Sequence, residues 1–160
     1  MGRMLSGLAG LVILVVAIHY FWVNGWDLVL AKLGEPPEMV TGRAMYLLKN
    51  GKADDGISLL TYQSSLGNRY ATMMLAVTYE HGRFAPKDSE KAFSYFKQLA
   101  DSGNGTAMNE IGLMYYCGQL GAPDLATARA WVCRAASAGS KPAQKNLQEL
   151  DAHRSMRCTL

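Results

Sequence analysis

Residues 67–102 read GNRYATMMLAVTYEHGRFAPKDSEKAFSYFKQLADS, and residues 103–138 read GNGTAMNEIGLMYYCGQLGAPDLATARAWVCRAASA. The two stretches match at an offset of 36 residues, and Gly139, Ala143 and Leu147 continue the same frame. The matched pairs are Gly67 and Gly103, Ala71 and Ala107, Leu75 and Ile111, Tyr79 and Tyr115, Gly82 and Gly118, Asp88 and Asp124, Ala92 and Ala128, Tyr95 and Trp131, and Ala100 and Ala136. Self-similarity at a fixed period of this size predicts a repeat protein whose units stack on one another.

Each unit has the hydrophobic pattern of two helices. Ala71, Leu75 and Tyr79 are spaced by four residues, and the apolar residues of 92–100 are spaced by three and four. That spacing is the period of a helix with one buried face. Gly82 favours the left-handed turn that ends a helix, and Asp88 is a residue type that starts one. The sequence therefore predicts helix pairs and an all-α fold.

Incomplete units flank the two full ones. Residues 42–67 form a degenerate unit, and residues 141–153 repeat a first helix only, with the polar outer face that the end of a solenoid requires. A Gly-Glu-Pro-Pro stretch breaks the chain before the first unit. The expected segments are a leader (1–4), a transmembrane helix (5–23), a juxtamembrane linker (24–40), a degenerate repeat (41–66), two repeat units (67–102 and 103–138), a capping helix (139–153) and a basic tail (154–160).

A charge-free apolar segment precedes the repeats. Residues 5–23 contain no Asp, Glu, Lys or Arg, and 15 of these 19 residues are apolar. Nineteen helical residues reach roughly 28 Å, the thickness of the hydrocarbon core of a bilayer. We therefore expect a single transmembrane helix that acts as an uncleaved signal anchor. A cleaved signal peptide is the alternative, but bulky aromatic residues such as Trp22 stand where a cleavage site needs small ones.

Two features of this segment concern its surroundings. Arg3 precedes it, and the positive-inside rule slightly favours a cytoplasmic N-terminus with the bulk of the chain exported. Ser6 and Gly10 have the small-xxx-small spacing that lets another transmembrane helix approach closely, so they are the candidate contacts within the membrane. Two small residues four apart also arise by chance in apolar helices.

Averages over the whole chain hide this division. The 160 residues are 49% hydrophobic and 18% charged, with a net charge of +3, as in one soluble domain. The content of 5 Pro and 3 Cys excludes collagen-like and disulfide-dense classes. Residues 125–160 hold 6 basic and 2 acidic side chains. This basic end suits an acidic partner or anionic lipid headgroups, and it is equally explained as a solvated face.

The repeat units resemble a known family. Five segments carry the likeness: Tyr79–Gly82, Lys87–Tyr95, Ala100–Asn104, Ile111–Tyr115 and Trp131–Ala136. They look like the Sel-one-like repeat (SLR), a relative of the tetratricopeptide repeat. The resemblance implies a short right-handed α-solenoid of antiparallel helix pairs that serves as a protein-binding scaffold. It implies no chemistry.

In such repeats, first-helix residues between the packing positions line the concave face. The resemblance therefore implies eight partner-binding residues: Tyr70, Met73, Val77, Glu80, Thr106, Asn109, Leu113 and Tyr116. Tyr, Met and Leu side chains suit adaptable binding of a peptide or a helix. The alternative is that several of these residues pack against a neighbouring helix or the transmembrane segment.

No pattern in the sequence indicates catalysis. The three histidines are far apart, and the sequence lacks the HExxH, CxxC, GxGxxG and GxSxG motifs. Asp54 and Asp55 fit the start of a helix, and His81 fits the end of one. We therefore expect no enzyme activity, catalytic residue, metal site or cofactor.

The three cysteines are constrained by the expected helices. Cys117 ends a first helix, whereas Cys133 lies about 13 Å along the antiparallel second helix, which is beyond disulfide reach. Cys158 follows the capping helix and emerges at the same end of the solenoid as Cys117. Cys117 with Cys158 is therefore the allowed disulfide in an oxidising compartment, and three free thiols are the alternative.

These inferences lead to one functional hypothesis and one alternative. We expect a membrane-anchored scaffold for protein–protein interaction, single-pass in the bacterial inner membrane, with a periplasmic repeat domain. The alternative is an accessory or assembly subunit that docks through its transmembrane helix on a larger integral-membrane complex. The expected partners are proteins, integral-membrane subunits among them, and the lipid bilayer, rather than nucleic acid or a small-molecule substrate.

Overall fold

The computed structural model describes residues 36–152. This part of the chain contains seven helices: α3 (Pro37–Lys49), α4 (Ala53–Ser65), α5 (Arg69–His81), α6 (Ser89–Asp101), α7 (Gly105–Tyr116), α8 (Leu125–Ser137) and α9 (Lys141–Asp151). The expected transmembrane helix with Ser6 and Gly10, and the basic tail with Cys158, lie outside the described residues. Within residues 36–152, no helix is both long enough and apolar enough to cross a membrane.

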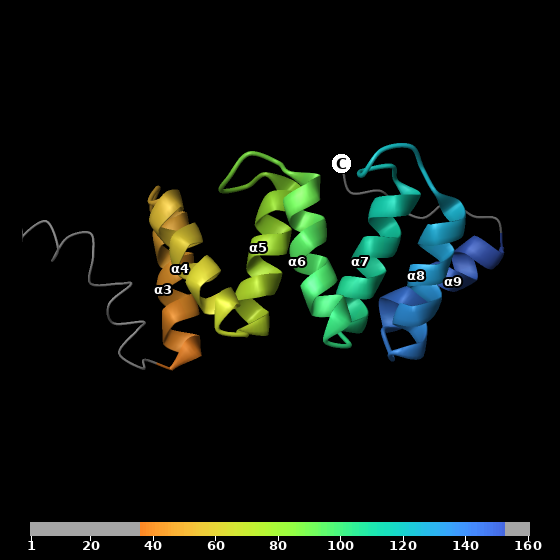
Figure 1. Ribbon diagram of the computed structural model, residues 1–160, viewed down its shortest axis with the longest axis horizontal. Helices are drawn as coiled ribbons and strands as arrows, with labels where there is room; N and C mark the ends of the chain where they lie inside the picture. The colour runs from red at the N-terminus through yellow and green to blue at the C-terminus, as the bar shows by residue number, and fades with distance from the viewer. Residues whose placement is uncertain (1–35, 153–160) are drawn as a thin grey trace, which may run out of the picture.

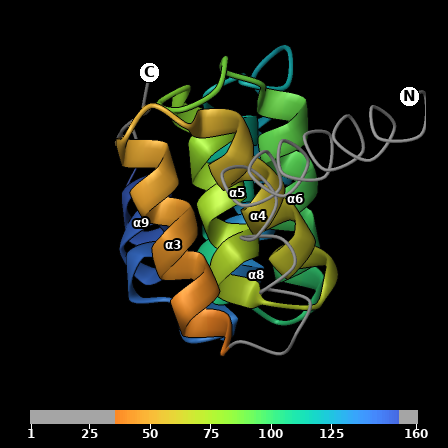
Figure 2. The ribbon, with the colours of Figure 1, turned by 90° about the vertical axis from the view of Figure 1, so that its left-hand side faces the viewer.

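The helices follow one another as antiparallel pairs along a row (Figure 1). The connections within the pairs α3–α4, α5–α6 and α7–α8 lie at the upper end in this view, and the connections between pairs lie at the lower end. Seen along the row, α3 and α9 lie toward one side and α4 and α6 toward the other (Figure 2). The expected all-α architecture of helix pairs is confirmed.

Side chains at the helix starts explain where most of the helices begin. The side chains of Asn68, Asp88, Asn104, Asp124 and Ser140 each accept a hydrogen bond from a backbone N–H in the first turn of α5 to α9. These bonds satisfy donors that a helix N-terminus otherwise leaves open. The caps of α6 and α8 are the two aspartates that the sequence predicts.

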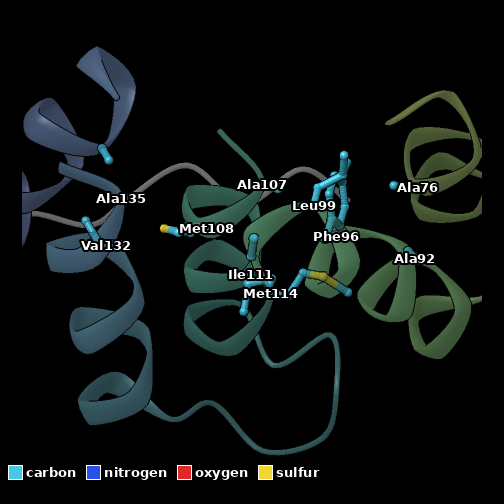
Figure 3. Packing of buried hydrophobic residues seen from close by; sticks show 12 residues of the cluster. Ala76, Ala92, Phe96, Leu99, Ala107, Met108, Ile111, Met114, Val132 and Ala135 are labelled. Atoms are coloured by element: carbon cyan, nitrogen blue, oxygen red, sulfur yellow. The ribbon is translucent and has the colours of Figure 1, made fainter. Parts of the chain in front are cut away.

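The core consists of two clusters of buried side chains that meet at the second pair. One cluster joins α3, α4 and the first half of α5. The other runs from α5 to α9, and its centre is drawn in Figure 3, where Ile111 and Met114 of α7 lie between Phe96 of α6 and Val132 of α8. Tyr79 and Tyr95 contact both clusters, and their rings stack with centroids 6.1 Å apart. The buried side chains therefore form one continuous core along the row of helices.

Small residues let the two helices of a pair cross closely. A Cβ atom on Gly112 would lie 3.1 Å from the carbonyl oxygen of Ala128 and 2.7 Å from a methyl carbon of Val132. In the first pair the glycine is on the second helix, because a Cβ on Gly56 would lie 2.9 Å from the carbonyl oxygen of Ala44. The same crossing is therefore built from a glycine on either helix.

The first pair is shorter than the others. Helices α5 and α7 begin at Arg69 and Gly105, an offset of 36, whereas α3 begins at Pro37, 32 residues before α5. The difference lies in the connection within the pair, which is residues 50–52 in the first and residues 82–88 in the second. The first turn of α3 falls in the stretch expected to be linker, since Pro37 occupies a helix start where a missing N–H is harmless.

Candidate partner-binding face

The eight residues expected on the concave face lie on α5 and α7, where they differ widely in burial. Tyr70 is 60% exposed. Thr106 is also exposed, and Met73, Val77, Leu113 and Tyr116 are half-buried. Glu80 and Asn109 are buried, with 5% and 2% of their surface accessible. We call the surface that α3, α5 and α7 present at these positions the first-helix face.

An open hollow of about 520 Å³ lies on this face between α3 and the start of α5. Its lining residues are Glu38, Thr41, Gly42, Met45, Asn68 and Tyr70. Of these, only Tyr70 is among the residues expected from the sequence. Gly42 contributes to the open space, because a Cβ atom there would have no atom within 4 Å. The lining includes one apolar side chain, Met45, one aromatic side chain, Tyr70, and one carboxylate, Glu38.

The repeat frame explains which residues line the hollow. With the 32-residue offset of the first pair, Glu38, Thr41 and Met45 occupy the positions of Tyr70, Met73 and Val77. The lining therefore continues the same set of first-helix positions into the degenerate unit. A frame of 36 residues misses this equivalence, and the shortened connection at Asn50-Gly51 is the signal that indicates it.

Exposed apolar side chains also occur on α3 and at the junction of α4 and α5. Met39 and Tyr46 are seven residues apart on α3 and thus share one side of that helix, and both are exposed. Leu66, at the end of α4, and Tyr70 are also exposed. Large apolar side chains grouped on a surface are typical of interaction sites, whereas single ones are common everywhere. Leu125, on α8, is an isolated example.

Two glutamates form an acidic pair on α5 and α7. Burial raises the pKa of Glu80, and Lys87 opposes this rise. Burial also raises the pKa of Glu110, and the nearby Glu80 carboxylate raises it further. The Nδ2 of Asn109 donates to Glu110 at 3.4 Å, and the Nε2 of His81 lies 3.9 Å from Glu80. The pair concentrates negative charge next to the half-buried positions of the face.

Asn109 has a structural role in addition to its place in the expected set. Its Oδ1 accepts a hydrogen bond of 2.9 Å from Nδ2 of Asn146 on α9. The bond crosses between α7 and α9, and it satisfies a buried amide that would otherwise cost stability. Sequence reasoning missed this contact, because residues 37 apart in different units show no shared pattern.

Comparison with known proteins identifies the repeats. The family model of the Sel1 repeat matches residues 69–104 and 105–140. These matches coincide with the units formed by α5 with α6 and by α7 with α8. The chain contains two Sel1 repeats. The resemblance noted in the sequence is thereby confirmed, and Sel1-repeat proteins are generally scaffolds for protein interaction.

Solved structures show the same fold. A Sel1 repeat protein from Oxalobacter formigenes is 19% identical, with a TM-score of 0.59, and the match covers 86% of this chain and 61% of that one. The protein c5321, a protective antigen in uropathogenic Escherichia coli strains that displays an SLR fold, is 22% identical with a TM-score of 0.63. That match covers 82% of this chain and 29% of the antigen. No curated protein matches the chain.

The residues expected at helix ends and the search for a metal site concern the described part of the chain. Residues 36–152 contain no group of three His, Cys, Asp or Glu side chains placed to hold a metal ion. Asp54 and Asp55 lie in the first turn of α4, and His81 lies in the last turn of α5. Their positions match the helix-end roles that their charges favour.

The described cysteines of the Sel1-repeat protein are in different states. Cys117, the C-cap of α7, is disulfide-bonded, whereas Cys133 in α8 is free and half-buried. Cys158 lies outside the described residues, so the expected pairing of Cys117 with Cys158 stays a prediction. Cys117 comes directly after Tyr116, the last of the eight residues expected on the first-helix face.

Proposed function

We propose that this protein is a membrane-anchored scaffold that binds an apolar segment of a protein partner on its first-helix face. The observation that carries the proposal is the hollow lined by Met45 and Tyr70, together with exposed Met39 and Tyr46 on α3. A wide, open hollow with aromatic and Met side chains suits a peptide or helix better than a small molecule, which needs an enclosed pocket.

The expected membrane segment supports anchoring close to this face. Residue 23 ends the apolar stretch, and α3 begins at Pro37. Only about a dozen residues therefore separate the proposed anchor from the hollow, which keeps the face near the bilayer. We propose a single pass through the inner membrane with the repeats in the periplasm. Alkaline phosphatase fused after Leu160 should be active there, whereas fluorescence of a reporter that matures only in the cytoplasm would contradict this topology.

The partner site is tested with the full chain in detergent. Purification after mild cross-linking should recover a stoichiometric partner with the parent protein. Tyr70→Ala removes an aromatic wall of the hollow and should reduce this recovery about tenfold, as expected for an aromatic residue at the centre of an interface. Leu125→Ala is the matched control, because Leu125 is 59% exposed, close to the 60% of Tyr70, and lies on α8. Equal recovery with both variants would contradict the proposal.

The brevity of the repeat array favours a second candidate, an accessory subunit of a larger membrane complex. The three helix pairs and one extra helix of residues 36–152 offer little area, and contacts within the membrane would add to it. In that case the double variant Ser6→Leu and Gly10→Leu, which places bulk on the expected helix surface, should abolish partner recovery while Tyr70→Ala leaves it largely intact. The scaffold proposal predicts the reverse order.

A further inference from the structure

The first-helix face continues from the hollow along α5. Tyr70 lines the hollow, and Met73 and Val77 follow it, half-buried, on the same side of the helix. Glu80 comes three residues after Val77 and about 15 Å along the helix from Tyr70. A partner segment that occupies the hollow and continues along α5 therefore reaches Glu80.

The first-helix face is acidic where it is charged. The charged residues at its positions on α3, α5 and α7 are Glu38, in the hollow, and Glu80, and these positions hold no Lys or Arg. Glu110 on α7 adds a third carboxylate, which is half-buried and so accessible to a ligand. Burial and the neighbouring carboxylate of Glu80 both raise the pKa of Glu110, so the two carboxylates lie close together. Charge complementarity therefore favours a cationic group on the partner.

Glu80 is a buried carboxylate without a hydrogen-bond donor in the described part of the chain. Only 5% of its surface is exposed. The Nε2 of His81 lies 3.9 Å from its Oε2, which is too far for a hydrogen bond. Among residues 36–152, Lys87 acts on Glu80 by charge but forms no salt bridge with it. Since buried polar side chains are almost always hydrogen-bonded, a partner that supplies a donor here gains an interaction that the repeats do not make themselves.

We propose that the partner segment carries an arginine that binds Glu80 and Glu110 while an apolar side chain of the same segment occupies the hollow. This inference rests on the proposed function and deepens it, because it names the chemistry of the partner. A guanidinium group holds several N–H donors in one plane and can pair with two carboxylates at once, whereas a lysine ammonium is a point charge. An extended segment spans the distance of about 15 Å in about four or five residues, which sets the spacing between the two side chains.

Selection from a random peptide library tests this chemistry without assuming a partner. The full chain in lipid nanodiscs is immobilised, and empty nanodiscs remove the peptides that bind lipid. Peptides of about a dozen residues, long enough to span both sites in an extended form, are displayed on phage. We expect enrichment of an arginine about four or five residues from a large apolar side chain. Enrichment of acidic residues, or of lysine as often as arginine, would overturn the paired-carboxylate site.

Variants in the same selection separate the arginine site from the hollow. Glu110→Gln should remove the enrichment of arginine and keep that of the apolar residue, whereas Tyr70→Ala should weaken the apolar preference. Glu90→Gln is the matched control, because Glu90 is exposed on α6 and lies off the face. Peptides enriched without a basic residue would overturn this inference and leave the proposed function standing. Failure to enrich any peptide would overturn both.

A binding cycle measures the contact itself. Fluorescence anisotropy gives the Kd of the selected peptide for the full chain, and replacing the arginine of the peptide by glutamine should weaken binding about tenfold. The same replacement should have little effect on binding to Glu110→Gln or Glu80→Gln, because the partner charge is already gone. An equal loss in the parent protein and both variants would show that the arginine binds elsewhere.

The alternative occupant of the acidic pair is a basic residue of this chain outside residues 36–152. In that case Glu110→Gln would lose an internal ion pair and would unfold at a lower temperature than the parent protein at pH 7. A carboxylate that waits for a partner predicts the opposite, since removing its charge relieves the repulsion from Glu80. Thermal unfolding without peptide distinguishes the two, and a lowered midpoint for Glu110→Gln would overturn the proposal.

Discussion

The first helix pair and the third build the same crossing in opposite ways. In α3–α4 the glycine is on the second helix, where Gly56 faces the backbone of Ala44, and in α7–α8 it is on the first, where Gly112 faces Ala128. The first pair also has a connection five residues shorter, residues 50–52 against residues 117–124. The comparison teaches that the repeat preserves a close crossing of its two helices, whereas the glycine that permits this crossing and the loop that joins the helices vary.

The largest expected effect comes from adding a methyl group at either glycine. Gly56→Ala and Gly112→Ala each place a Cβ atom within 3.1 Å of a carbonyl oxygen, which forces the helices apart. Each change should lower the free energy of unfolding by about 1–3 kcal/mol. Chemical denaturation followed by circular dichroism measures this change. If only one variant is destabilised, the two crossings are not equivalent.

Gly42→Ala is the matched control for these variants. Gly42 is also helical, but a Cβ atom there would have no neighbour within 4 Å. Because alanine favours a helix over glycine, this change should raise the free energy of unfolding by about 0.5–1 kcal/mol. A loss of stability in Gly42→Ala would show that glycine removal itself, rather than the close crossing, explains the first two results.

A second difference between the pairs concerns the start of the second helix. Asp124 caps α8 through the backbone N–H of Thr127, whereas Lys52 precedes α4 without a side-chain cap. Lys52→Ser should create a capping box with Asp55 and stabilise the protein by about 0.5–1 kcal/mol. The thermal unfolding midpoint measures this gain. Lys49→Ser is the control, because Lys49 is at the end of α3, where no free backbone N–H of a helix start is available for a serine side chain. A gain in the unfolding midpoint of Lys49→Ser would contradict the capping mechanism.

Much of the fold follows from local chemistry that a sequence displays. The 36-residue frame, the caps at Asp88 and Asp124 and the left-handed Gly82 with φ of 67° each act within one turn or one loop. The degenerate unit is also visible, since Gly56 takes the place of Ala92.

The candidate site was less accessible to sequence reasoning, for two physical reasons. The hollow depends on the shortened connection at residues 50–52, which shifts Glu38, Thr41 and Met45 out of the 36-residue frame. The burial of Asn109 depends on Asn146 in another unit, and the acidic pair depends on the distance between two helices. Such contacts between units leave no period in the sequence.

The smallest expected effect is a dependence of stability on pH. It arises from glutamates of the second and third pairs that the first pair lacks. Leu48 of α3 occupies the position of Glu80 in the 32-residue frame, so the first pair has no carboxylate there. Burial and the neighbouring Glu80 raise the pKa of Glu110 in the folded state. The folded protein therefore binds this proton more tightly than the unfolded chain does. The resulting stability is fully present below the ordinary pKa of 4.5 and is lost as the pH rises through the raised value.

Glu110→Gln mimics the protonated carboxyl at every pH. At pH 7 this variant should unfold at a higher temperature than the parent protein, and the difference should shrink to nothing below about pH 4. Glu90→Gln, on the exposed side of α6, is the control and should show no such disappearance of a difference in acid.

The aspartate caps act in the opposite direction, because hydrogen bonds from backbone N–H groups lower the pKa of Asp88 and Asp124. Their contribution is lost in acid in both proteins, so it cancels in the comparison. A difference between Glu110→Gln and the parent that stays constant from pH 7 to pH 4 would mean that the glutamate acts through packing rather than charge.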